Sequence, residues 1–178
     1  ISLIEPEFNS DTHPTLRDAI GKLPEIRAGE IYENDPLHRS RNLSDLNLKR
    51  IRQSKPGGTW RDWDDDLLLE AYKKDSGKSF GSVYGRLEWD KPANTITTQF
   101  PGIGNGRFGH PEQDRALSLR EGALLQTFPL NYAFVNPKQG SNYPISQVAL
   151  QIGNAVPPRL GEVIGKSILR HLEEVSNV

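Results

Sequence analysis

Residues 151–158, with the sequence Gln-Ile-Gly-Asn-Ala-Val-Pro-Pro, are the part of the chain best suited to hold a ligand against the backbone. Glycine and asparagine tolerate the unusual backbone angles of a tight turn. The two prolines fix φ near its helical value, where the N–H groups of a first helical turn have no partner within the helix. Apolar residues then follow a helical stripe that starts at Leu160 and ends near His171. The pattern predicts a rigid turn that presents backbone groups to a ligand, although packing alone also favours such a turn.

A glycine-rich loop at residues 101–114 is a second candidate contact region, because it contains Arg107 and His110. An arginine in a flexible loop can offer two donors to a guanine base. For His110, a hydrogen bond within the loop is the alternative interpretation. Two runs rich in β-forming residues, 82–89 and 95–100, precede the loop and predict short strands that position it.

Capping signals predict the helices that surround these regions. Ser118 is followed three residues later by Glu121, which is a capping box, and Phe128-Pro129 is expected to end that helix. Thr15 and Ser44 are typical N-cap residues. The remaining helices are predicted at residues 16–23, 44–54 and 66–74.

Residues 38–61 are locally basic and include a predicted helix beside a Gly-rich loop. Such a helix suits contact with phosphate, which positions a protein on nucleic acid without reading its sequence. A solvated helix face, balanced by the aspartates that follow, is the alternative. The basic residues are Arg39, Arg41, Lys49, Arg50, Arg52, Lys55 and Arg61.

The composition excludes several classes of function. Cysteine is absent, so these residues supply neither disulfides nor thiol chemistry. No apolar run approaches the ~20 residues of a membrane span and no signal peptide is visible, so a cytoplasmic protein is expected. The four histidines lack the spacing of metal ligands, and no metal site is expected. The segment from Gly161 to Ser167 is similar to a phosphate-binding loop, but it has three residues between the glycines where that motif needs four.

The low apolar content indicates a missing partner surface. Hydrophobic residues make up 35% of the 178 residues and the net charge is −1, which gives no overall case for nucleic acid. Gly161 and Gly165 lie within the last predicted helix and suggest that it packs closely against another backbone. The chain starts at Ile1 and has no methionine, so we expect it to be a piece of something longer.

Residues 115–129, Arg-Ala-Leu-Ser-Leu-Arg-Glu-Gly-Ala-Leu-Leu-Gln-Thr-Phe-Pro, precede the 151–158 motif. In this order, the two motifs resemble motifs IX and X of the DNA (cytosine-5) methyltransferases. The resemblance is strong over residues 84–168 and weaker over 1–83. It implies an α+β fold: a small mixed target recognition domain with short strands and helices, plus a C-terminal helix that belongs to the missing Rossmann-like catalytic domain. The implied segments are a connector from the catalytic domain at 1–30, the target recognition domain at 31–114, the motif IX helix and loop at 115–145, and the motif X turn with the C-terminal helix at 146–178.

The resemblance also implies ligands for named residues. In this family motif X closes one side of the site for S-adenosylmethionine, so Asn154, Ala155 and Val156 are the expected cofactor contacts. The recognition domain faces double-stranded DNA, where Thr95-Ile96 is the best local match. The expected DNA-binding residues are Arg86, Thr95, Ile96, Arg107 and His110.

The nucleophile of the family is a cysteine thiolate that adds to carbon 6 of a flipped-out cytosine, and this chain has no cysteine. We therefore interpret the chain as the recognition and cofactor-closing part of such an enzyme, inactive alone, which needs the N-terminal catalytic part as its partner. It is either an isolated fragment or the smaller polypeptide of a split enzyme. The alternatives are a non-enzymatic DNA-binding module derived from this scaffold and an interaction protein that has reused it.

Overall fold

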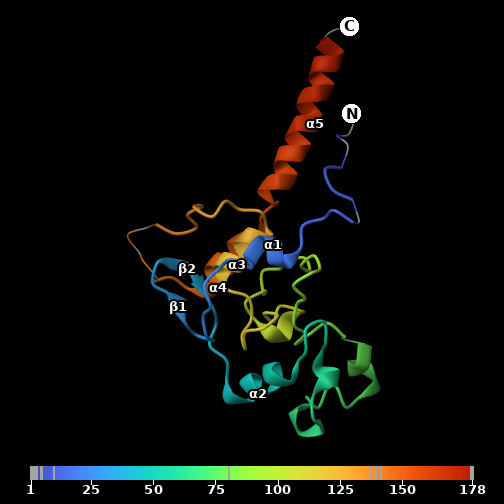
Figure 1. Cartoon of the computed structure of the whole chain (residues 1–178), viewed down its shortest axis with the longest axis vertical. Helices are drawn as coiled ribbons and strands as arrows, with labels where there is room; N and C mark the ends of the chain where they lie inside the picture. Colours follow the sequence, from blue (N-terminus) through green and yellow to red (C-terminus); the bar gives the residue numbers. More distant parts are fainter. Residues whose placement is uncertain are drawn as a thin grey trace.

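The computed structural model describes residues 4, 6–9, 11–79, 81–136, 138, 140 and 142–176. Figure 1 shows helices α1, α3 and α4 grouped at the centre, a small hairpin beside them, and α2 with several short turns at the far end from the termini. Helix α5 extends away from this body as a long rod, with the N-terminal segment alongside. The elements are α1 (Leu16–Ile20), β1 (Ile31–Tyr32), β2 (Asp35–Arg39), α2 (Asp45–Gln53), η1 (Trp60–Asp62), η2 (Asp65–Leu67), η3 (Asp75–Ser79), η4 (Ile103–Asn105), α3 (Leu119–Leu125), α4 (Ile145–Asn154) and α5 (Pro158–Ser176).

Helix α3 lies at the centre of the main hydrophobic core. It contacts α1, α4 and the hairpin strand β2, and Leu119 and Ala123 on it are fully buried. Phe100 packs so tightly against Gly122 of α3 that a side chain there would overlap its ring. The other buried members of this cluster are Leu16, Ile20, Leu37, Leu87, Ile96, Phe108, Leu117, Tyr143, Val148, Ala149 and Ile152.

The three capping residues are confirmed. Thr15 starts α1 in a capping box with Asp18, Ser44 accepts a bond from the third residue of α2, and Ser118 forms the predicted capping box with Glu121 at the start of α3. Two of these helices end earlier than predicted, α1 at Ile20 and α3 at Leu125. Helix starts are easier to predict than helix ends, because a start is marked by a polar side chain that bonds the free N–H groups.

The turn predicted at residues 151–158 is shorter than expected, because residues 151–154 form the last turn of α4 and only 155–157 connect it to α5. Neither Gly153 nor Asn154 has a positive φ. A Cβ on Gly153 would lie 2.5 Å from the carbonyl carbon of Thr97 and 2.6 Å from the Cα of Thr98. Gly153 is therefore a site of close helix packing, and the change of direction comes later, at Ala155, which is extended. Pro158 is the first residue of α5, as a proline at the start of a helix should be.

The prediction of strands at 82–89 and 95–100 is wrong, because neither segment is part of a sheet. The only sheet among the described residues is the β1–β2 hairpin, which was not predicted. Extended segments instead lie side by side through single bridges, from Pro56 to Arg86, from Arg86 to Gly109, and from Gly109 to Ala116. Glycines and prolines interrupt each segment, so no ladder can extend beyond one pair.

The α-helix predicted at 66–74 is also wrong, because the segment contains only the end of the short turn η2 and then irregular turns that lead to η3. Leu67 is buried against Trp60 and Trp63, and the ring of Tyr72 stacks on Trp60 with centroids 4.5 Å apart. Three successive leucines at 67–69 cannot share one face of a helix, so an aromatic cluster organises this part of the chain.

A buried ionic network joins α3 to the loops around it. The carboxylate of Glu121 accepts hydrogen bonds from Nη1 and Nη2 of Arg115, both at 2.7 Å, and from the backbone N–H of Ser118 at 2.6 Å. Arg115 is fully buried and also donates to the carbonyl oxygen of Ile26 at 3.1 Å. Burial raises the pKa of Glu121, but the hydrogen bonds and charge of Arg115 outweigh it, so its pKa lies below the usual range.

His110 lies beside this network in the core. Its Nδ1 accepts hydrogen bonds from the N–H groups of Glu112 at 3.2 Å and Gln113 at 2.9 Å. Burial lowers the pKa of His110 to about 4; the carboxylate of Glu121 opposes this shift and the guanidinium of Arg115 adds to it. The imidazole is therefore neutral near pH 7.

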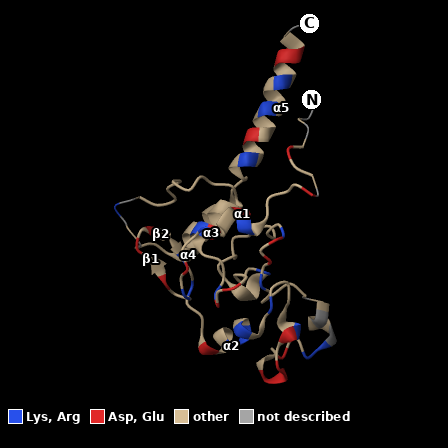
Figure 2. Cartoon of the chain, in the orientation of Figure 1, with Lys and Arg blue, Asp and Glu red and all other residues tan. Residues whose placement is uncertain are grey.

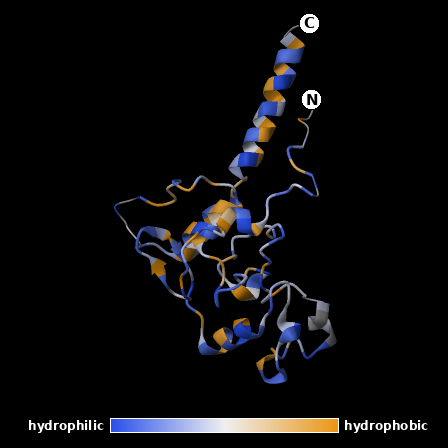
Figure 3. Ribbon diagram, in the orientation of Figure 1, coloured by the Kyte–Doolittle hydropathy of each residue, from blue (hydrophilic) through white to orange (hydrophobic). Residues whose placement is uncertain are grey.

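Helix α5 makes few contacts with the rest of the chain. Hydrophobic residues lie along its exposed surface, and Figure 3 shows them alternating with hydrophilic residues on the rod. Nothing lies within 4 Å of where a Cβ would stand on Gly161 or Gly165, so within this chain these glycines face open space. No described helix is long and apolar enough to cross a membrane. The exposed apolar residues of α5 are Leu160, Ile164, Ile168, Leu169, Leu172 and Val175.

The close contact at Gly153 predicts opposite effects for two glycine-to-alanine changes. Gly153→Ala should lower the free energy of unfolding by about 1–3 kcal/mol, because its Cβ meets backbone that cannot move aside. Gly161→Ala is the matched control and should raise stability by up to about 1 kcal/mol, because alanine favours the helix and the space is open. Urea unfolding of the two variants measures both effects; a stabilised Gly153→Ala variant would contradict the close packing.

The position of His110 predicts a specific loss of stability in mild acid. The unfolded chain binds a proton near pH 6.5 and the folded chain only near pH 4, so stability is full above about pH 6.5 and falls as the pH drops toward 4. The loss due to this group approaches about 3 kcal/mol. His110→Asn keeps an acceptor for the two N–H groups but cannot titrate, and it should show a shallower decline. Unfolding curves at several pH values test this, and parallel declines would contradict it.

Candidate functional site

The segment from Asn154 to Val156 connects two helices at the surface. Asn154 is the last residue of α4, Ala155 is its extended C-cap, and α5 begins two residues after Val156. Asn154 and Val156 are exposed and Ala155 is half-buried. Among the described residues, the amide of Asn154 makes no hydrogen bond, so its donor and acceptor both face outward.

Contact of this segment with S-adenosylmethionine stays a prediction, for which the chemistry of its side chains is suitable. An amide and an apolar side chain, that of Val156, are presented on the same short stretch, and the cofactor has both polar and apolar parts. The two large cavities described for the chain are lined by other residues, so the segment alone does not enclose a ligand. The other walls of such a ligand site have to come from residues outside this segment.

Arg86 is buried and its guanidinium is used within the chain. Nε donates to the carbonyl oxygen of Ser54 at 2.8 Å, and Nη1 donates to the carbonyl oxygens of His110 at 2.8 Å and Gln113 at 2.7 Å. Nη2 lies against the carboxylate of Asp114. Arg86 thereby ties the end of α2 to the loop that contains His110, and in this structure it does not face solvent.

Two more of the expected DNA contacts, Ile96 and His110, are also buried. Ile96 belongs to the main core and His110 to the ionic network. Both side chains therefore support the loops rather than lie on their surface. DNA contact by Arg86, Ile96 or His110 stays a prediction that would require a rearrangement of the core.

Thr95 and Arg107 have the accessible positions. Thr95 is exposed and lies two residues before Thr97, which with Thr98 packs on Gly153 of α4. Arg107 is half-buried, and its Nη1 donates to the carbonyl oxygen of Gly58 at 2.9 Å. Within the described residues no hydrogen bond involves Nε or Nη2, so this edge of the guanidinium keeps the paired donors that match the two acceptors of guanine.

The basic region divides into buried and exposed residues. Arg50 donates to the carbonyl oxygen of Leu67 at 2.9 Å and lies over the ring of Trp63, so it is a core residue rather than a phosphate contact. Arg52 is exposed but pairs with Asp114 at 3.1 Å. Lys49 and Lys55 are exposed. Figure 2 shows basic residues on α2 and acidic residues on the turns beyond it, so positive charge is limited to part of this end of the molecule.

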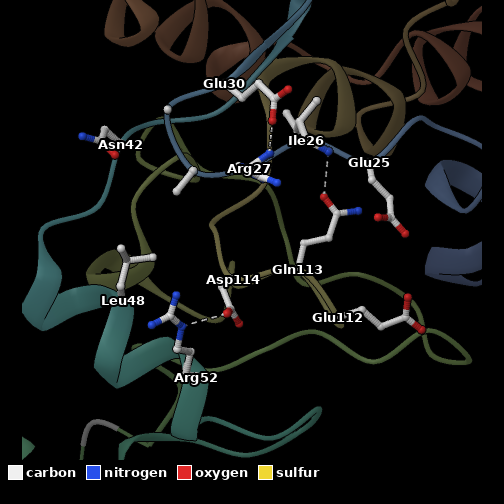
Figure 4. Close-up of a pocket in the computed structure, with 12 residues that line it drawn as sticks. Glu25, Ile26, Arg27, Glu30, Asn42, Leu48, Arg52, Glu112, Gln113 and Asp114 are labelled. Atoms are coloured by element: carbon white, nitrogen blue, oxygen red, sulfur yellow. Dashed lines mark hydrogen bonds and ion pairs between the residues drawn. The ribbon is translucent and has the colours of Figure 1, made fainter.

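A cavity of about 1080 Å³ lies between α2, the 25–30 loop and residues 112–114. Figure 4 shows that the side chain of Gln113 bonds the backbone of Ile26, and that Arg52 reaches Asp114 across the cavity. Carboxylates outnumber guanidinium groups around it, which disfavours the phosphates of nucleic acid. The charged lining residues are Glu25, Arg27, Glu30, Arg52, Glu112 and Asp114.

Sequence reasoning missed the residues that hold the candidate contacts in place. Gly58, whose carbonyl oxygen accepts the bond from Arg107, appears in the sequence only as part of a Gly-rich loop. Gln126, which donates to the carbonyl oxygen of Ile152 at 2.9 Å, was read only as part of a motif. Neither role has a local signal, because each contact joins residues far apart in the chain. Among the described residues, no group of three or more acidic, histidine or cysteine residues is placed so that it could hold a metal ion.

The chain was compared with known proteins. Residues 3–170 match the model of the family described as C-5 cytosine-specific DNA methylase. The chain is 56% identical to the Type II methylase M.HgiDII of Herpetosiphon aurantiacus over 97% of this chain and 48% of that protein. It is 33% identical to the Type II methyltransferase M.Eco47II of Escherichia coli over 91% of this chain and 36% of that protein.

A third relative is shorter. The Type II methyltransferase M.AquIB of Picosynechococcus sp. is 36% identical over 72% of this chain and 83% of that protein. The chain thus spans about half or less of the first two relatives and most of the third. Because the family model covers nearly the whole chain, this chain belongs to the C-5 cytosine-specific DNA methylase family.

Proposed function

We propose that this chain provides DNA sequence recognition and one wall of the cofactor site in a cytosine-5 DNA methyltransferase. The observation that carries the proposal is the family match over residues 3–170 in a chain without cysteine. The resemblance of residues 115–129 and 151–158 to motifs IX and X supports the recognition and cofactor-closing roles, and the composition leaves no thiolate to attack cytosine. The nucleophile is therefore supplied by protein outside these 178 residues.

The partner in this proposal is the catalytic part of the methyltransferase. The exposed apolar residues of α5 support it, because the described residues leave such a stripe on a projecting helix largely uncovered. The high coverage of M.AquIB supports a separate polypeptide of this extent, while the other two relatives support a longer single chain. The same α5 surface serves in both arrangements.

S-adenosylmethionine, when bound, supplies the methyl group for carbon 5 of cytosine. In the proposal, Asn154 holds a polar group of the cofactor and Val156 covers an apolar part, with Ala155 between them. The exposure of both side chains on one connection supports these roles. The remainder of the pocket belongs to the catalytic part, so the chain alone should bind the cofactor weakly.

Recognition of double-stranded DNA is assigned to the loops around Thr95 and Arg107. Arg107 reads a guanine through its Nε and Nη2 edge, while its Nη1 remains on Gly58. Lys55, exposed in the loop that leads to Gly58, contacts phosphate. Arg86, Ile96 and His110 act from within the core, where they fix the shape of the recognition loop.

A methylation assay tests the proposal. The chain alone, incubated with DNA and labelled S-adenosylmethionine, should form no 5-methylcytosine. Adding the part of M.HgiDII that this chain does not cover should restore labelling, because it would complete the motifs. Label from the chain alone would overturn the proposal. DNA binding without restored labelling would favour the non-enzymatic module, and loss of both would favour an interaction protein.

Two variants of the reconstituted enzyme should separate base reading from phosphate contact. Arg107→Ala should relax sequence choice, at a cost of ~1–3 kcal/mol in discrimination at one base. Lys55→Ala should weaken binding to all sequences alike and reduce the salt dependence by about one phosphate contact. Sequencing of the methylated cytosines defines the target, and binding to single-base variants of it then measures both effects. Equal, sequence-independent losses for the two variants would remove Arg107 from base reading.

A further inference from the structure

The end of helix α3 contains a strained residue. Thr127 has a φ of 63°, a left-handed conformation that β-branched residues rarely adopt and that glycine occupies in many helix ends. Its N–H donates to the carbonyl oxygen of Leu124 at 2.8 Å, and the N–H of Phe128 donates to that of Ala123 at 3.0 Å. A glycine would close α3 in this way without strain. The threonine side chain therefore needs a separate explanation.

The hydroxyl of Thr127 caps a different helix. Its Oγ1 accepts a hydrogen bond at 3.0 Å from the N–H of Arg159, the second residue of α5. The N–H groups of a first helical turn have no partner within the helix. Pro157 directly before α5 and Pro158 at its first position offer no side chain that could cap these groups. Thr127 thus supplies from α3 the cap that the local sequence of α5 lacks.

Gln126, the residue before Thr127, bonds the other end of the connection between α4 and α5. The side chain of Gln126 is buried, and its Nε2 donates to the carbonyl oxygens of Ile152 at 2.9 Å and Ala155 at 3.4 Å. These carbonyls belong to the end of α4. Two adjacent residues that directly follow α3 therefore bond the end of α4 and the start of α5, and the segment from Asn154 to Val156 lies between these contacts.

We propose that Gln126 and Thr127 are positioning residues for the cofactor-binding segment, and that they set the direction of Asn154 and Val156 toward S-adenosylmethionine. This inference rests on the proposed function, which makes the segment a wall of the cofactor site. The physical reason is that an exposed connection between two helices has few contacts of its own. Its geometry then depends on the groups that bond the helix ends on either side.

Variants at Thr127 isolate the hydroxyl from the strain. Thr127→Val keeps the branched shape without the hydroxyl, Thr127→Ser keeps the hydroxyl, and Thr127→Gly removes both the hydroxyl and the strain. Amide hydrogen exchange of the chain itself should show faster exchange at Arg159 in the valine and glycine variants and the original rate in the serine variant. The glycine variant should melt no lower than the original chain, which separates loss of the cap from loss of stability. Unchanged exchange in the valine variant would overturn the inference.

Kinetics of the reconstituted enzyme give the second readout. The KM for S-adenosylmethionine should rise ~2–10-fold in Thr127→Val and Thr127→Gly, as expected for one net hydrogen bond, and should be restored in Thr127→Ser. Gln126→Met, which removes the donor at similar length, should behave like the valine variant. The KM for DNA should not change in any of them. An unchanged cofactor KM, or equal rises for cofactor and DNA, would overturn the positioning role.

The two proposals fail in different ways. A chain with the original sequence that cannot restore methylation overturns the proposed function and with it the cofactor role of the segment. The exchange rates of Arg159 then still decide whether Thr127 holds the connection between α4 and α5. If methylation is restored but the KM for S-adenosylmethionine is the same in the Gln126 and Thr127 variants as in the original chain, only the inference is overturned.

Discussion

The buried carboxylate of Glu121 is the group on which the rest of the structure depends. It completes the cap of α3 through Ser118 and neutralises Arg115, which in turn bonds the carbonyl oxygen of Ile26. Because both groups are buried, removal of one member of such a pair leaves a charge unpaired, at a cost of about 3–5 kcal/mol. Burial also keeps His110 neutral. The network therefore fixes the start of α3 and the loops around it as one unit.

Helix α3 connects the two proposed functions of the chain. At its start, Arg115 and the neighbouring His110 hold the loop that continues from Arg107. At its end, Gln126 and Thr127 hold the connection between α4 and α5. Helix α4 also packs through Gly153 on the segment that carries Thr95. The loops proposed to face DNA and the segment proposed to face the cofactor are thus attached to the same helices, so a shift of α3 or α4 should move both.

The sequence by itself identified the family, through motifs IX and X in the right order, and it located the starts of three helices. Both kinds of inference rest on local chemistry: a capping serine or threonine marks a helix start wherever it lies, and a motif is read along the chain. The same local reading failed for the strands at 82–89 and 95–100 and for the helix at 66–74. Those segments follow long-range partners, which are the backbone of Gly109 for the first strand and Trp60 and Trp63 for the helix.

The roles of individual residues divide in the same way. Sequence alone determined that Asn154 and Val156 lie where α5 is about to begin, and that no cysteine of this chain can attack a base. Only the tertiary structure decided that Gly153 serves close packing, that Arg50 and Arg86 donate to backbone carbonyl oxygens inside the protein, and that Arg107 is half-buried and bonds the carbonyl oxygen of Gly58. The reason is physical: arginine suits a buried carbonyl cluster as well as a nucleic acid, and only the arrangement of distant segments determines which of these partners it meets.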